Sequence, residues 1–338
     1  MIVRPAILCS LLCCSIATVT LADPPVAPTA PAAPARPDGK PAPAPPAAAK
    51  PAPVVRLLDA GAEPRRELRL SPKAGAKQVV EMSQRMSMEQ AVGGFSMPAT
   101  NMPETIITIE YEVESVADGV ITYNAEVTGA EVKESQGVQP QVLQAMKRSY
   151  ESAIGTKFRT TMNNRGIISS LEMQSAGRQD PLQGQQMESL REAMRNMMMP
   201  LPSEAIGVGG SWQVYTVNDL NGFTVETTTV LKVVSLDGDN VELEVAVSMD
   251  ADEQNMNAPG MPAGSTVRLM SLDADGKGKS TCRFDSVAPV SSTMATQTKM
   301  NMDLDTPAMS QSMTQTTRIA VTVKAGESKK KAAPAAAE

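Results

Sequence analysis

The side chains that could do chemistry in this chain are carboxylates, cysteines and an unusual number of methionines. The sequence has 37 Asp and Glu, four Cys, 23 Met and no His. Catalysis by a Ser-His-Asp or Cys-His arrangement needs an imidazole base, and zinc sites in proteins normally use His together with Cys. The composition therefore excludes these chemistries, and we expect a protein that is not an enzyme and holds no cofactor.

The carboxylates are plentiful but follow a strand pattern. Glu110, Glu112 and Glu114 alternate with apolar residues, and so do Glu242 and Glu244. This period places them on the outward face of predicted strands, where a solvated surface explains them. A hydrolase that uses a pair of carboxylates is left open by sequence alone.

Two short segments imitate ligand-binding loops. Gly278-Lys279-Ser280 resembles the end of a phosphate-binding loop, but Asp273 stands where the first glycine of that motif belongs. Asp273-Ala274-Asp275-Gly276 resembles a calcium loop, but Phe284 stands where a bidentate Glu is required. We therefore predict an ordinary hairpin, with this acidic segment as the turn between strands 267–272 and 280–284.

Methionine thioethers are soft ligands that suit Cu(I). Met86/Met88 and Met300/Met302 are Met-x-Met pairs, and 197–199 is a methionine triplet. The i,i+2 spacing also follows from strand parity, and no histidine is present to complete a site. Soft-metal binding is the third-ranked hypothesis for this chain, and no metal residue is assigned.

Alternating apolar and polar residues predict most of the secondary structure. The pattern is strong at Val241–Met249 and recurs in at least six other segments between Gln78 and Lys324. Asp118-Gly119 and Asp237-Gly238-Asp239 are hairpin signals, and 163–166 is a third. About twelve strands are expected.

Two helices are predicted beside these strands. One begins near Pro140 and stops at Gly155, and the other covers 183–199 before Pro200 and Pro202. The expected fold is mainly β with two or three helices. Its antiparallel strands form one curved half-barrel or open barrel packed on the helices.

The strand pattern also predicts a duplication. Residues 111–119 align with 231–238, and in both places a hairpin and a long acidic strand follow. We expect a single domain over 57–324, with halves at about 57–180 and 200–324 joined by helix 183–199.

The methionines supply the functional hypothesis. Met309 and the other predicted inward methionines line the wall of the half-barrel, and methionine adapts to irregular and flexible partners. We expect a lipid or other apolar ligand in the concave face. The alternative is a structural or protein-interaction module of the cell envelope whose core is filled. The residues assigned to the ligand groove are Met82, Met86, Met88, Tyr111, Met249, Met294, Met300, Met302 and Met313.

The N-terminus predicts export. Arg4, the apolar run 6–19 and the small residues before Asp23 form a signal peptide over 1–22. Its cysteines lack the preceding small residue of a lipobox, so lipid anchoring is not expected. We predict a periplasmic, cell-envelope or extracellular location with no transmembrane segment in the mature chain.

Low-complexity segments flank the domain. Residues 23–56 form a Pro/Ala-rich linker, and 325–338 form a disordered tail. Removing Arg4 with the signal leaves 30 Lys and Arg against 37 Asp and Glu, a net charge of −7. This balance argues against nucleic acid as a partner.

One block resembles a known family. Leu201-Pro202, Ile206-Gly207-Val208-Gly209 and Trp212 resemble the block between two halves of a duplicated β-rich domain in secreted bacterial proteins of unknown function. The resemblance covers roughly 60–324 and carries over no catalytic residue. The expected shape is similar to periplasmic lipoprotein carriers and lipid-binding half-barrels, and that resemblance implies acyl-chain binding by analogy of fold. Trp212 is expected to anchor its strand to the core.

Overall fold

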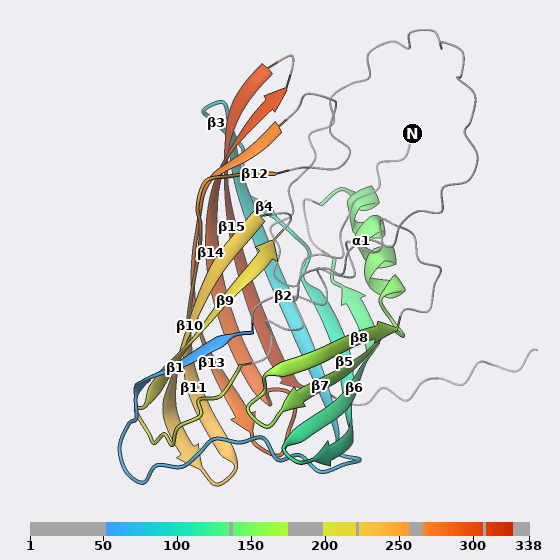
Figure 1. The fold of residues 1–338 in the computed structure, drawn as a ribbon. Coiled ribbons are helices and arrows are strands. Elements are labelled where there is room, and N and C mark those ends of the chain that lie inside the picture. Colours follow the sequence, from blue (N-terminus) through green and yellow to red (C-terminus); the bar gives the residue numbers. More distant parts are fainter. Residues whose placement is uncertain are drawn as a thin grey trace, which may run out of the picture.

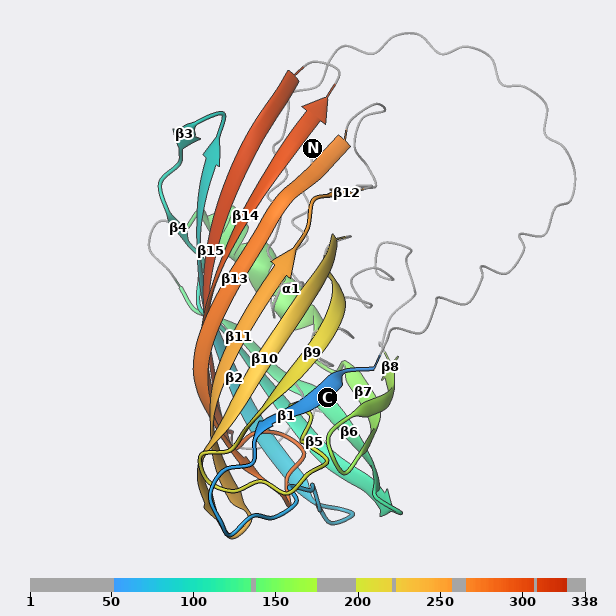
Figure 2. The same ribbon diagram turned by 60° about the vertical axis from the view of Figure 1, so that its left-hand side comes forward.

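The computed structural model describes residues 52–134, 138–174, 199–220, 223–256, 266–306 and 309–326. Its strands within these ranges all belong to one curved antiparallel sheet (Figures 1 and 2). The long strands of the first half of the chain are β2 (Lys77–Val92), β5 (Thr105–Ala117), β6 (Val120–Val132), β7 (Lys157–Asn163) and β8 (Ile168–Gln174). Those of the second half are β9 (Ser211–Leu220), β10 (Phe223–Asp237), β11 (Asn240–Ala251), β13 (Thr266–Arg283), β14 (Ser291–Thr306) and β15 (Met309–Ala325).

Four short strands complete the sheet: β1 (Val54–Asp59), β3 (Phe95–Ser96), β4 (Thr100–Asn101) and β12 (Gln254–Met256). The order along the main path is β1-β9-β10-β11-β13-β14-β15-β2-β5-β6-β7-β8, with β3 and β4 added to β2 and β12 added to β13. The sheet is open, with β1 and β8 at its two ends. β1 begins at Val54, inside the segment that the sequence assigns to the linker.

The alternating pattern produces two chemically different faces. In β11, for example, Val241, Leu243 and Val245 are buried while Glu242 and Glu244 are exposed. We call the side that carries the buried residues the inner face and the other the outer face. Asp118 (φ 50°) and Gly119 (φ 74°) form the β5–β6 turn, in which both central residues take positive φ. The mainly β prediction is confirmed by this sheet.

The predicted hairpin at Asp273–Gly276 is wrong, because β13 runs unbroken through it. Hydrogen-bonded neighbours lie on both sides: Gly276 pairs with Val247 on β11 and with Thr296 on β14. The alternation also continues through the segment, with Asp273, Asp275 and Lys277 on the outer face. Glycines inside an interior strand are compatible with pairing where the sheet bends or another backbone comes close.

The helix count also differs from the prediction of two or three. Among the described residues there is one helix, α1 (Pro140–Ser152), which begins with Pro140 in its first turn. It lies on the inner side beside β6 and buries Met146 and Tyr150 (Figure 1). The second predicted helix, 183–199, lies outside the described residues up to 198. α1 has 13 residues, and the described part of the chain has no helix long and apolar enough to cross a membrane.

The hairpins β5–β6 and β10–β11 share a detail that alternation does not predict. In β5 the register skips Glu114, so that Val113 and Ser115 face consecutive residues of β6. In β10 it skips Val234, between Val233 and Ser235. Both bulges stand at the same distance before the turn, and a bulge increases local twist. The two hairpins therefore curve in the same way.

Three groups of buried side chains make up the core. The first lies on β2 and β5–β8 under α1 and includes the Tyr111–Tyr123 pair. The second surrounds Trp212 at the start of β9, with residues from the end of β10 and the start of β11. The third contains Phe223, Leu269, Met300 and Met302 at the opposite end of the second half. The inner face is thus packed in three places, and half-buried Leu70 packs against both the first and the second group.

Candidate functional site

The inner face carries no charge along the described residues of the long strands. Every described Lys, Arg, Asp and Glu of β2, β5–β7, β9–β11, β13, β14 and β15 alternates to the outer face, as the buried partners of each register show. Outer-face charges pair across strands, as in Lys324–Glu81 at 2.8 Å and Arg318–Glu89 at 2.6 Å. A molecule that lies on the inner face of these strands, away from the charged residues of α1, would therefore meet apolar and neutral polar groups.

Some inner-face residues of β14, β15 and β2 lie between the three core groups and, among the described side chains, belong to none of them. We call these residues the central strip. Its rows follow from the register: Thr296 pairs with Ile319 and Ile319 with Met86, while Thr298 pairs with Thr317 and Thr317 with Met88. Thr317 is buried, and the other five side chains are half-buried. The members of the central strip are Thr296 and Thr298 on β14, Thr317 and Ile319 on β15, and Met86 and Met88 on β2.

Glutamines stand at both ends of the central strip. At one end Gln90 Nε2 donates to Gln315 Oε1 at 3.2 Å, and Gln315 Nε2 donates to the Thr317 hydroxyl at 3.2 Å. At the other end Gln84 is 5% exposed, and its Nε2 has no hydrogen-bond partner in the described structure. Gln84 is not among the predicted groove residues, although its parity with Met82 and Met86 marks it as a polar residue on an inner face.

The glycines of β13 border the central strip. A Cβ atom on Gly276 would come within 2.4 Å of Thr296 Cγ2, and one on Gly278 within 2.1 Å of the Thr293 carbonyl oxygen. β13 and β14 therefore approach each other more closely than side chains at these positions would allow. Such close approach is typical of a sharply coiled sheet.

The predicted groove residues all lie at inner-face positions but do not form one site. Met82 and Tyr111 are buried in the first core group, and Met300 and Met302 in the third. Met249 and Met313 pack against the third group, and Met294 against the second. Met86 and Met88 are the two that lie in the central strip. The side chain of Met309 is outside the described part.

The electrostatics of the tyrosine pair indicate packing. The Tyr111 and Tyr123 rings are 6.0 Å apart, centroid to centroid, and tilted by 51°. Burial raises the pKa of Tyr111, and the neighbouring Tyr123 raises it further. Burial likewise raises the pKa of Tyr123 to about 12. Both phenols therefore stay neutral at ordinary pH, and Tyr111 belongs to the filled part of the inner face.

Several of the outward carboxylates form ion pairs, among them Glu112 and Glu114. Glu114 receives two hydrogen bonds from the Arg159 guanidinium, both at 2.8 Å, and the side chain of Glu114 is 42% exposed. These hydrogen bonds lower the pKa of Glu114. Within the described ranges, no group of three His, Cys, Asp or Glu side chains could hold a metal ion. Cys282 is a free thiol whose pKa burial raises.

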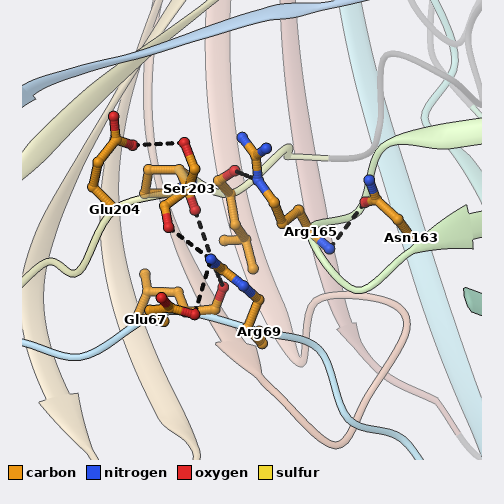
Figure 3. A network of polar contacts seen from close by, with 9 residues as sticks. Glu67, Arg69, Asn163, Arg165, Ser203 and Glu204 are labelled. Atoms are coloured by element: carbon orange, nitrogen blue, oxygen red, sulfur yellow. Dashed lines mark hydrogen bonds and ion pairs between the residues drawn. The ribbon is translucent and has the colours of Figure 1, made fainter. Parts of the chain in front are cut away.

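A polar network joins the two halves near the Leu201-Pro202 block (Figure 3). Arg69 donates to the carbonyls of Pro202 at 2.9 Å and Ser203 at 2.7 Å, and Arg165 Nε donates to the Leu201 carbonyl at 2.9 Å. Trp212 is fully buried, and its indole N–H donates to the Pro200 carbonyl at 2.8 Å. The arginines are engaged by backbone carbonyls, so the network positions segments of the chain.

A hollow of about 450 Å³ lies between β6 and α1. Its lining includes Glu131, Lys133, Lys147 and Glu151. Lys133 pairs with Glu104 at 3.3 Å, and Lys147 pairs with Glu134 at 3.6 Å. This hollow is charged and its lysines already have partners, so it does not suit an apolar ligand.

Comparison with known proteins gives no family. No family model matches the chain, and no curated protein matches it. Among solved structures, a protein from Bacteroides fragilis described as exported, with a YmcC-like fold, is similar over 74% of this chain and 97% of its own. The identity is 10% and the TM-score 0.24. A loop-deletion variant of OmpT, an outer membrane protein of Vibrio cholerae, covers 73% of this chain and 99% of its own, at 7% identity and a TM-score of 0.21. At these scores neither likeness supports an argument about fold or function.

Proposed function

We propose that this is an exported, non-catalytic protein that binds a lipid or other apolar molecule on the inner face of its sheet, with the central strip as the contact surface. The N-terminal pattern of a signal peptide supports export. One observation carries the binding proposal: half-buried Met86, Met88 and Ile319 lie on a charge-free face and outside the three described core groups. When a ligand removes such half-buried apolar side chains from water, the free energy of the complex is lowered.

Methionine suits this role because it adapts its shape. Its unbranched, polarizable side chain fills irregular space and accepts flexible partners such as acyl chains. The buried methionines of the third core group, Met300 and Met302, serve packing, whereas Met86 and Met88 are available for contact. The proposed ligand surface is therefore narrower than the methionine set that the sequence indicates.

Native mass spectrometry of protein extracted gently from its source tests the proposal. We expect added mass that organic solvent removes, and binding of the neutral dye Nile red to the stripped protein. A Met88→Lys variant, which places a charge on the central strip, should bind the dye at least about tenfold more weakly, because an unpaired charge on an apolar surface is costly. The control is Ser87→Lys on the outer face. A clean apo mass together with no dye binding would end the proposal and leave the cell-envelope interaction module as the better explanation.

A further inference from the structure

We infer, building on the proposed function, that the ligand is an uncharged amphiphile. The central strip takes its acyl chain, and Gln84 Nε2 donates a hydrogen bond to a neutral acceptor in its head group, such as the carbonyl of a glycerol ester. Gln84 is thus a ligand-binding residue that selects among lipids by the charge of their head group.

The inner face provides the first argument, because no cation stands on it along the described long strands to receive an anionic head group. The Lys and Arg residues of these strands lie on the outer face, where several pair with Asp or Glu. A fatty-acid carboxylate or a phosphate on the central strip would lose its water without gaining an ion pair from these strands. A neutral ester loses far less hydration and needs one or two donors.

Gln84 provides the second argument. Its neighbours on the adjacent strands are Thr105 of β5 and Val321 of β15, and its side chain is 95% buried. The amide nitrogen nevertheless lacks an acceptor in the described structure. Buried amide N–H groups in proteins are nearly always bonded, so an unpaired one indicates a partner that is still to be identified. A ligand carbonyl satisfies that requirement.

The other glutamines indicate how the ligand is oriented along the central strip. Gln90 and Gln315 bond to each other, and Gln315 bonds onward to Thr317. Gln84 stands six residues from Gln90 along β2, or about 20 Å. Met86 and Met88 lie between them, so the apolar surface runs away from Gln84. The head group is therefore placed at Gln84 and the chain over the two methionines.

A pair of probes with the same chain but different head groups tests the inference. Monododecanoylglycerol and dodecanoate are titrated into the full mature protein at pH 8, and displacement of Nile red is measured. We expect the glycerol ester to bind at least about tenfold more tightly than the carboxylate. Dodecanoate should gain affinity as the pH falls and its carboxyl group is protonated.

Gln84→Met removes the donor while keeping the size and the methionine character of the face. We expect the affinity for the glycerol ester to fall about three- to tenfold and the affinity for dodecanoate to stay the same. The thermal midpoint should stay level or rise, because an unsatisfied buried group is lost. Gln297→Met on the exposed outer face of β14 is the matched control, and it should change neither affinity.

The outcomes separate this inference from the function on which it rests. Equal binding of the two probes by wild-type protein, or an unchanged ester affinity in Gln84→Met, overturns the inference while lipid binding stands. Gln84→Leu serves as a second variant if Gln84→Met is poorly folded. Binding of neither probe, with no dye to displace, overturns the proposed function itself.

Discussion

The first half of the sheet, β2 with β5–β8, and the second half, β9–β11 with β13–β15, begin their hairpins with the same backbone contacts. Gly75 N donates to the Val113 carbonyl at 2.8 Å, and Gly209 N donates to the Val233 carbonyl at 2.8 Å. Each contact precedes a bulge of one residue and a turn that contains Gly119 or Gly238. Local backbone rules are therefore shared by the two halves.

The halves differ in where their bulky inward side chains lie. β5, β6 and β7 direct Tyr111, Tyr123 and Phe158 into one core group under α1. In the second half, the inward positions in the middle of β13 and β14 include Gly276, Gly278 and Thr296. The bulky residues of the first half pack in one group, whereas those of the second half, such as Trp212 and Phe223, pack in two groups, and small inward residues lie between them on β13 and β14. Repeated backbone geometry therefore does not require repeated side-chain packing.

The largest expected effect is on the free energy of unfolding, and it distinguishes the start of β9 from the start of β2. Trp212 on β9 and Gln78 on β2 each stand one residue inside their strands, but Trp212 is fully buried and Gln78 is half-buried. Trp212→Ala should lower the free energy of unfolding by about 3–5 kcal/mol. Gln78→Ala, which loses hydrogen bonds to 288–289, should lower it by about 1 kcal/mol. Urea unfolding measures both, and equal losses would show that the two strand starts contribute equally to stability.

A second pair of variants compares packed methionine with available methionine. Met302 is 1% exposed inside the third core group, and Met88 is half-buried in the central strip. Met302→Ala should cost about 2–4 kcal/mol because it leaves a cavity. Met88→Ala should cost less than about 1 kcal/mol in the ligand-free protein, since little packing is lost. A large loss at Met88 would mean that the central strip is part of a solid core.

The third comparison concerns glycines in strands that have a neighbouring strand on both sides, Gly278 in β13 and Gly129 in β6. Gly278→Ala should destabilise the protein by about 1–3 kcal/mol, because its Cβ would meet the Thr293 carbonyl and backbone yields little. Gly129→Ala in the first half meets the Thr108 side chain at 3.2 Å, which can adjust, and should cost less than about 1 kcal/mol. Thermal unfolding of the two variants checks the order. If Gly129→Ala lowered stability more than Gly278→Ala, the close approach of β13 and β14 would not distinguish the second half from the first.

The smallest effect is a pH dependence in the first half. Glu104 contacts Arg85 at 3.2 Å and Lys133 at 3.3 Å. Partial burial raises the pKa of Glu104, but the hydrogen bonds from Lys133 and Arg85 outweigh it and lower the pKa overall. Because the pKa of Glu104 is lower in the folded state, its ionised carboxylate stabilises the fold at pH values above those at which carboxyl groups ordinarily titrate. That stabilisation is lost as the pH falls from about 5 toward 3.

Glu104→Gln should therefore flatten the decline of the thermal midpoint over this window. The contribution of Glu104 to the free energy of unfolding should be less than about 1 kcal/mol, as is usual for ion pairs near the surface. Parallel curves for wild type and variant would show that Glu104 does not couple its titration to folding.

Sequence reasoning predicted what depends on local alternation. The parity of Met86, Met88 and Met294 identified their face, and Asp118-Gly119 and Asp237-Gly238 identified their turns. It failed at Asp273–Gly276, where pairing with β11 and β14 overrides a turn-like composition. It also treated Tyr111 and Met302 as equivalent to Met88. Parity specifies the side of a sheet, but which side chains pack together depends on contacts between distant strands.

The junction of β15 with β2 has a consequence for biogenesis. Met88 pairs with Thr317, and these partners are separated by more than two hundred residues of chain. Contacts of such long range form late and slowly. A polypeptide that lacks its last strand would leave one edge of β2 unpaired and would have no complete central strip. The central strip, and with it any binding of the kind proposed above, would then form only when the final strand has emerged and docked.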